Sequence, residues 1–156
     1  MDLNNYINLV FRKNFSAQVL KANMRVVGNC EYGLLFYRDK LPKFNNKGKM
    51  IMNCIDWDRD SSTKKIHPTQ KPLKLIEKLV ELFSDEGDVV IDPVAGSGVT
   101  ILACDNKKRK GYGFEIKKEF YTESKKLIED NLLKFKEINE YGFAKTELQK
   151  INPTLF

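Results

Sequence analysis

A short apolar run that leads directly into a glycine-containing turn is the feature that most restricts how this chain can fold. Val89–Ile91 is typical of a buried parallel strand, and the turn Asp92–Thr100, which holds Gly96 and Gly98, follows at once. Because glycine has no Cβ, such a turn can approach a ligand closely. Turns of this kind lie at the edge where open α/β sheets bind ligands. Two glycines are also common in tight turns for backbone reasons alone, so the pattern indicates a site but does not identify its ligand.

The segments around this turn predict alternating strands and helices. Apolar side chains at helical spacing predict a helix from Leu73 to near Ser84. A short helix is expected over 99–106, a strand over 111–116 and a longer amphipathic helix over 117–138. This order is typical of a right-handed βαβ unit with a parallel sheet.

The N-terminal part of the chain is expected to contain extended segments. Apolar and aromatic runs predict strands over 6–11 and 31–37 and a short extended piece over 51–55, with a loop over 14–29. Residues 56–66 are highly charged and are interpreted as a linker.

Glu115, at the end of the strand that follows the glycine turn, indicates a nucleoside in the ligand. An acid in this place can accept hydrogen bonds from both hydroxyls of a ribose, although a surface acid at a helix start would also be stable. NAD fits less well, because Ile101 occupies the place of the third glycine of the dinucleotide pattern and Asp92 would repel a pyrophosphate. A cationic cofactor without phosphate, such as S-adenosylmethionine, suits the turn better.

Three motifs together resemble the β class of DNA amino-methyltransferases, which methylate adenine N6 or cytosine N4. The hexapeptide His67–Pro72 reads HPTQKP, the glycine turn reads DPVAGSGVT, and Gly111–Glu115 with Tyr121 is similar to the family's continuation. The resemblance extends over residues 6–128. It implies a partial Rossmann-like S-adenosylmethionine-dependent methyltransferase fold, that is, an α/β protein with three αβα layers and an incomplete central sheet.

The resemblance also implies a set of cofactor-binding residues. Asp92 would lie near the methionine amino group, Glu115 would bind the ribose, and Thr69 and Lys71 would hold the methionine end. Val94 stands where the family usually has an aromatic ring. The complete expected set is Thr69, Lys71, Asp92, Pro93, Val94, Gly96, Gly98 and Glu115.

Catalysis in this family depends on a loop of the form (Asp/Asn/Ser)-Pro-Pro-(Tyr/Phe/Trp), which holds the flipped target base. The chain has five prolines and no two are adjacent, so this loop is not in the sequence and we assign no catalytic residue. The segments present resemble the family's strands 1, 2, 6 and 7, while strands 4 and 5, between those pairs, are missing. We therefore expect a gap in the sheet that exposes strand edges and apolar surface.

Two functions from different classes follow. The chain is the cofactor-binding half of a DNA methyltransferase and needs a partner chain that carries the loop, or it is an inactive remnant that binds S-adenosylmethionine or DNA. A homo-oligomer would be another way to cover the gap. A nucleotide-binding module of the dehydrogenase type is a third, weaker interpretation.

The composition adds limits to these expectations. The net charge of +6 is compatible with a DNA partner or with a solvated lysine-rich surface. One histidine and three scattered cysteines do not support a metal site, and reduced, mostly buried thiols are expected. No apolar run is long enough for a membrane span and the N-terminus does not read as a secretory signal, so a cytoplasmic location is expected.

These expectations give one domain over residues 1–156. Residues 6–55 would form the family's strands 6 and 7 with their loop, 56–66 the linker, 67–138 the cofactor-binding segment and 139–156 a polar tail.

Overall fold

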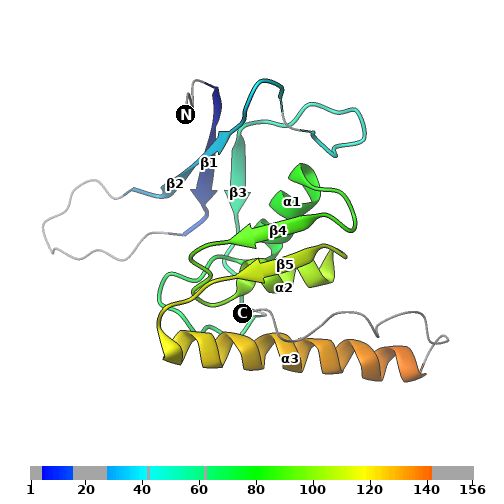
Figure 1. The fold of residues 1–156 in the computed structure, drawn as a ribbon. Helices are drawn as coiled ribbons and strands as arrows, with labels where there is room; N and C mark the ends of the chain where they lie inside the picture. Colours follow the sequence, from blue (N-terminus) through cyan, green and yellow to red (C-terminus); the bar gives the residue numbers. More distant parts are fainter. Residues whose placement is uncertain (1–4, 16–27, 42, 62, 142–156) are drawn as a thin grey trace, which may run out of the picture.

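The computed structural model describes residues 5–15, 28–41, 43–61 and 63–141, which form two small sheets and three helices (Figure 1). The elements in chain order are β1 (Tyr6–Lys13), β2 (Cys30–Phe36), β3 (Cys54–Trp57), α1 (Leu73–Phe83), β4 (Val89–Asp92), α2 (Val99–Asn106), β5 (Lys110–Gly113) and α3 (Lys118–Tyr141). None of the helices in this described part is long and apolar enough to cross a membrane.

The three-stranded sheet has the order β2–β1–β3, with β2 antiparallel and β3 parallel to β1. Alternate residues of a strand point to opposite faces. One face of this sheet packs against α1, where Ile55 and Trp57 of β3 form a buried cluster with Leu75. The packed face thus attaches the N-terminal strands to the helical part of the protein.

The two-stranded sheet consists of β4 and β5, which run parallel and are connected through α2. Val90 of β4 packs against a buried cluster formed by Val80 of α1 with Ala103 and Cys104 of α2. A Cβ on Gly113 would lie 2.6 Å from Cδ1 of Ile101, and one on Gly111 would lie 3.1 Å from its Cα. The glycines that allow close packing of helix and strand are therefore on the strand, which explains why α2 can carry a bulky residue at position 101.

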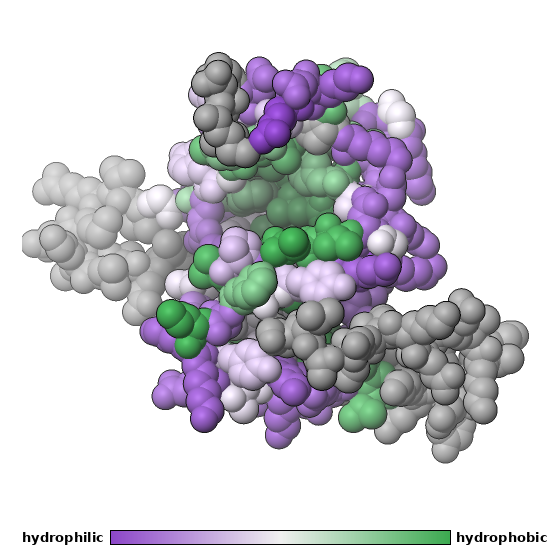
Figure 2. All heavy atoms as spheres, viewed as in Figure 1, coloured by the Kyte–Doolittle hydropathy of each residue, from purple (hydrophilic) through white to green (hydrophobic). Residues whose placement is uncertain are grey.

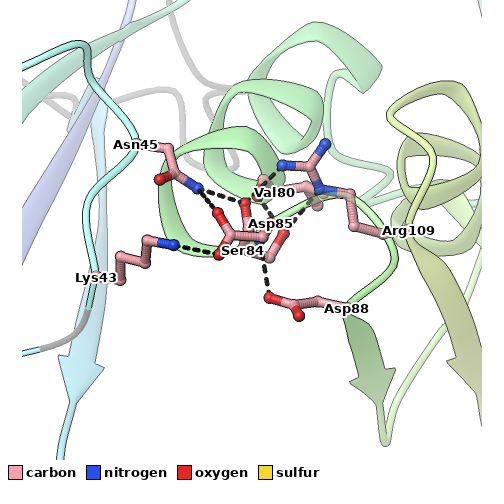
Figure 3. A network of polar contacts seen from close by, with 7 residues as sticks. All are labelled: Lys43, Asn45, Val80, Ser84, Asp85, Asp88 and Arg109. Carbon is pink, nitrogen blue, oxygen red and sulfur yellow. Dashed lines mark hydrogen bonds and ion pairs between the residues drawn. The ribbon is translucent and has the colours of Figure 1, made fainter.

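A network of polar contacts joins the loop before β3 to the amino end of β4 (Figure 3). Asn45 donates hydrogen bonds to the carbonyl oxygen of Ser84 (2.7 Å) and to Asp85 Oδ1 (2.8 Å), and Lys43 forms an ion pair with Asp85. Arg109 donates from Nε to the Ser84 hydroxyl (3.0 Å) and from a second nitrogen to the Ser84 carbonyl. These contacts give Lys43, Asn45, Asp85 and Arg109 polar partners at this end of the two-stranded sheet.

The edge strands β2 and β4 each have no strand on their outer side among the described residues, and each carries exposed apolar side chains. On β2, Tyr32, Leu34 and Phe36 alternate along one face with 73%, 53% and 47% of their surfaces exposed. On β4, Val89 and Ile91 are 56% and 62% exposed. Figure 2 shows apolar side chains gathered between the three-stranded sheet and β4.

The fold class expected from the sequence is confirmed as a partial Rossmann-like α/β fold, although its sheet is divided into two. Of the three expected layers, the described residues form two. These are the layer of strands and the layer of helices on the face of β4 that carries Val90. The helix over 99–106 agrees with α2. The parts of the expected loop over 16–27 and of the tail from residue 142 onward lie outside the described residues.

Several strand bounds and the burial of the thiols differ from expectation. The third strand is Cys54–Trp57 rather than 51–55, because Ile55 and Trp57 pair with β1 and are buried while Met50 and Met52 are exposed. The last strand ends at Gly113, three residues earlier than expected. Only Cys104 of the three cysteines is buried, whereas Cys30 is half-buried and Cys54 is exposed, so the expectation of mostly buried thiols is wrong.

Candidate functional site

The glycine turn and the residues after β5 form one hydrogen-bonded unit at the carboxyl ends of β4 and β5. These ends lie side by side because the strands are parallel and Asp92 pairs with Gly113. The Phe114 amide donates to the Asp92 carbonyl (3.0 Å), and the Ala95 amide donates to the Phe114 carbonyl (2.8 Å). Phe114 therefore leaves the strand and pairs with the turn, which is why the strand stops before Glu115.

The Glu115 carboxylate is held by backbone donors from both sides of this edge. Its Oε2 accepts from the Gly96 amide (2.9 Å), and its Oε1 accepts from the Lys117 amide (2.8 Å). Each carboxylate oxygen can accept more than one hydrogen bond. The acid is thus fixed in orientation and can still accept a hydroxyl at each oxygen.

Gly96 and Gly98 are required for different reasons. Both have positive φ, 52° and 70°, which favours glycine. A Cβ on Gly96 would meet no atom closer than His67 Cδ2 at 3.9 Å, so space beside this residue is open. A Cβ on Gly98 would lie 3.0 Å from Cβ of Ser124, because this buried residue packs against α3. Gly96 can therefore adjoin a ligand, while Gly98 serves packing.

Asp92 shapes the start of the turn. Its Oδ1 accepts a hydrogen bond from the Val94 amide (3.0 Å), and the residue is half-buried. The next two residues of the turn, Pro93 and Val94, are exposed, and Val94 shows 79% of its surface.

A hollow of about 600 Å³ opens beside Glu115 and is lined mainly by apolar side chains. Phe114 and Ile116, on either side of the acid, are 61% and 98% exposed. A largely apolar hollow with a few fixed polar groups is typical of a small-molecule site. The lining residues are Pro93, Val94, Gly113, Phe114, Glu115, Ile116, Lys118 and Tyr121.

The hexapeptide His67–Pro72 is an ordered turn that lies against the glycine turn. The amide and the hydroxyl of Thr69 contact Nδ1 of His67 at 3.2 and 3.0 Å, and the Gln70 side chain bonds the backbone of Lys64 and Ile66. The His67 ring packs edge-on against Phe120, with centroids 4.4 Å apart. His67 thus packs between the glycine turn and Phe120 of α3.

Lys71, in the same hexapeptide, belongs to a charged cluster on the three-stranded sheet. Glu31 of β2 forms ion pairs with Lys71 and with Lys13 of β1 (2.6 Å to Lys13), and both ammonium groups lie over the Trp57 ring, 4.9 and 5.0 Å from its centroid. Burial raises the pKa of Glu31, but the hydrogen bonds and charges of the two lysines outweigh it, so its pKa is lowered overall. Glu31 therefore stays ionised at neutral pH and holds Lys71 in place.

The structure divides the expected site residues between two hollows. Pro93, Val94 and Glu115 line the apolar hollow, while Thr69 and Lys71 line a second hollow beside the hexapeptide. The hexapeptide and the glycine turn are nevertheless adjacent. The His67 ring borders the open space at Gly96, and Leu73, directly after the hexapeptide, packs against the buried cluster that contains Ala95. The roles of these residues toward a cofactor stay predictions.

Five residues that line the apolar hollow were not among the expected site residues: Gly113, Phe114, Ile116, Lys118 and Tyr121. Phe114 and Ile116 flank Glu115 directly, and two large apolar residues around an acid at a strand end would have been a usable signal. Lys118 gave no such signal, because lysines are frequent throughout the chain.

Comparison with known proteins gives consistent results. The family model described as N6_N4_Mtase, DNA methylase, matches residues 7–126. The type II methyltransferase M.HpaI of Haemophilus parainfluenzae is 38% identical over 80 residues, covering 51% of this chain and 26% of the relative. M2.DpnII of Streptococcus pneumoniae is 34% identical over 100 residues, covering 60% of this chain and 36% of the relative.

A solved structure, titled as the M1.HpyAVI–SAM complex, matches with a TM-score of 0.63 and 29% identity, covering 80% of this chain and 64% of that chain. The chain thus spans about a quarter to a little over a third of the two curated relatives and about two thirds of the solved one.

Proposed function

Because the chain belongs to the DNA methylase family, we propose that it is the S-adenosylmethionine-binding part of an enzyme that methylates adenine N6 or cytosine N4 in DNA. Support comes from three sources: the matched family is one of DNA methylases, the similar M1.HpyAVI was solved with SAM, and the glycine turn forms a ligand-sized hollow with Glu115.

The geometry around Glu115 is the observation that carries the proposal. The carboxylate is oriented by the amides of Gly96 and Lys117, in a position suited to accept the two ribose hydroxyls. The exposed side chains of Val94, Phe114 and Ile116 suit the apolar faces of an adenine ring. The open space beside Gly96 leaves room for the ligand. The residues present therefore fit an adenosine.

The methionine end of the cofactor is assigned to residues around the start of the turn and the hexapeptide. Asp92, at the carboxyl end of β4, suits a cationic amino group. Thr69 and Lys71 suit the carboxylate, and Glu31 and Trp57 already hold the Lys71 ammonium group at the hexapeptide. Bound S-adenosylmethionine would supply an activated methyl group. The residues described here would bind and orient the cofactor.

Transfer to a base needs the loop that holds the target amine, and these 156 residues contain no adjacent prolines. We propose that another segment, in a partner chain or elsewhere in the protein, supplies this loop together with the strands that fill the sheet. The unpaired edges of β2 and β4 and the exposed apolar residues Tyr32, Leu34 and Ile91 support this proposal. Exposed apolar patches of this kind mark interaction surfaces.

Calorimetric titration of the chain with S-adenosylmethionine, with NAD as a control, tests the cofactor assignment. We expect binding to S-adenosylmethionine only, and a loss of at least about 10-fold in affinity on Glu115→Ala or Asp92→Ala, because each removes a charged acceptor. Glu129→Ala and Asp130→Ala, at exposed positions on α3, are matched controls that should bind normally. Tight binding of NAD, or unchanged binding by the Glu115 and Asp92 variants, would contradict the assignment.

The inactive remnant is distinguished by transfer of a labelled methyl group to DNA. An enzyme half becomes active when a chain carrying the proline loop and the missing strands is added. A remnant still binds S-adenosylmethionine but gives no transfer with any such chain.

A further inference from the structure

The second hollow, of about 500 Å³, lies beside the hexapeptide and is lined by cations from several elements. Lys13 comes from β1, Lys71 from the hexapeptide, and Arg59 and Lys65 from the segment that connects β3 to it. Two aromatic rings, Phe15 and Trp57, also line it. The site assigned to the adenosine has a different, apolar lining.

Most of these cations are held by neighbouring side chains. Lys13 and Lys71 share the Glu31 carboxylate and lie over the Trp57 ring. The Arg59 guanidinium lies 4.8 Å from the centre of the Phe15 ring, and cation–π contacts of this kind fix a side chain without neutralising its charge. The hollow therefore presents positive charge in a partly preorganised arrangement.

The positive charge is only partly compensated. Two acids line the hollow beside the four cations: Glu31, which balances one of the two lysines that it contacts, and Asp60, which accepts hydrogen bonds from the amides of Thr63 and Leu73. Arg59 and Lys65 are exposed, and neither has a carboxylate within ion-pair distance among the described residues. By contrast, Lys107 and Lys108 of the basic turn before β5 are paired with Glu81 and Glu86. No described carboxylate therefore neutralises Arg59 or Lys65.

The basic hollow lies close to the glycine turn, where the cofactor is proposed to bind. Thr69 and Lys71 line the hollow, and His67 of the same hexapeptide borders the open space beside Gly96. An anion bound there would lie next to the proposed cofactor site.

We propose that this basic hollow binds the phosphate backbone of DNA beside the target nucleotide, with Arg59 and Lys65 as the contacting residues; this inference rests on the proposed function. Four cations from three segments exceed what one methionine carboxylate requires, and Arg59 and Lys65 are on the exposed side. Binding of phosphates by such cations releases counterions, which makes the affinity depend on salt.

The test measures binding of the chain to a fluorescent 20-base-pair duplex by anisotropy over a range of salt concentrations. Arg59→Ala/Lys65→Ala should weaken binding and reduce the slope of log affinity against log salt by about 1 to 2, since each lost phosphate contact removes about 0.9. Lys125→Ala/Lys126→Ala, on α3, removes the same charge away from the hollow and should leave the slope nearly unchanged.

Titration of the same variants with S-adenosylmethionine and with 5′-methylthioadenosine, which lacks the amino acid, separates the two sources of an anion. The DNA assignment requires that Arg59→Ala/Lys65→Ala bind both small molecules as the unmodified chain does. A loss for S-adenosylmethionine alone would mean that the hollow holds the methionine carboxylate and would overturn the inference. Equal DNA slopes for the two double variants would also overturn it, while leaving cofactor binding, and with it the proposed function, intact.

Discussion

The two ends of the β4–β5 sheet differ in how their polar groups are satisfied. At the amino end, Arg109, Asn45 and Asp85 form a network in which each side chain has partners (Figure 3). At the carboxyl end, backbone amides orient one carboxylate, and apolar side chains such as Ile116 remain exposed around it. Saturated polar groups stabilise a fold, whereas exposed apolar groups around a fixed acceptor provide for a ligand.

The difference predicts that substitutions at the two ends have opposite effects. A change at the amino end should reduce the free energy of unfolding and leave cofactor affinity unchanged. A change at the carboxyl end should weaken cofactor binding and leave the free energy of unfolding nearly unchanged.

The largest effect is expected for Arg109→Met. The variant removes hydrogen bonds from a charged, half-buried donor to the hydroxyl and carbonyl of Ser84, which costs about 2 kcal/mol in the free energy of unfolding. Urea unfolding measures the loss, and titration with S-adenosylmethionine, below the unfolding transition, should give unchanged affinity.

Lys108→Met is the matched control for this variant, because Lys108 lies in the same turn but is exposed and has only a 3.5 Å ion pair with Glu86. Its effect on stability should be within about 0.5 kcal/mol. A loss of cofactor affinity in the Arg109 variant as large as its loss of stability would show that the two ends are coupled.

Local signals in the sequence predicted the elements around the glycine turn well. The helix α2 has the expected bounds, Val99–Asn106, because a positive-φ glycine precedes it and a positive-φ Lys108 soon follows it. The helix α1 ends at Phe83, as its apolar spacing indicated.

The features that the sequence did not predict depend on contacts between distant residues. The register of β3 follows from pairing with β1, where Ile55 lies opposite Phe11, and the apolar run of Met50 to Met52 resembles a strand without being one. The Glu31–Lys71 pair joins residues 40 positions apart. No local pattern shows which of the many lysines a given acid contacts.

A smaller effect, of the opposite kind, is expected for Ile116→Ser at the carboxyl end. Ile116 is 98% exposed, so the substitution should change the free energy of unfolding by less than about 0.5 kcal/mol. If a bound adenosine covers this side chain, its loss should weaken S-adenosylmethionine binding about 5-fold, the equivalent of roughly 1 kcal/mol of apolar burial.

Met50→Ser is a suitable control for the Ile116 variant, because Met50 is completely exposed and does not line the apolar hollow. It should bind the cofactor normally. Equal affinities of the two variants would mean that the exposed apolar residues around Glu115 do not contact the cofactor. The two ends of the sheet would then not differ in cofactor binding.

The smallest effect is expected for Glu31. This acid is paired with lysines, like the polar groups at the amino end, but it contacts Lys71 of the hexapeptide, close to the proposed cofactor site. Burial raises its pKa, but the hydrogen bonds and charges of Lys13 and Lys71 lower it by more, so the pKa of Glu31 lies below its ordinary value of 4.5. A carboxyl group with a lowered pKa stabilises the folded state above the unfolded-state pKa, and this contribution disappears as the pH falls through the folded-state pKa. Glu31→Gln should therefore destabilise the protein at pH 7 and do so by less at pH 3.

The effect at pH 7 should be below about 1 kcal/mol, because the pair is partly exposed and solvent screens it. Urea unfolding of both proteins at the two pH values measures the difference, with Glu123→Gln, at an exposed position on α3, as the control. A difference that is equal at pH 7 and pH 3 would show that Glu31 acts by packing rather than by charge. A difference confined to neutral pH would show that an ion pair fixes the hexapeptide to the three-stranded sheet, so that stabilising polar contacts extend to the edge where the cofactor is proposed to bind.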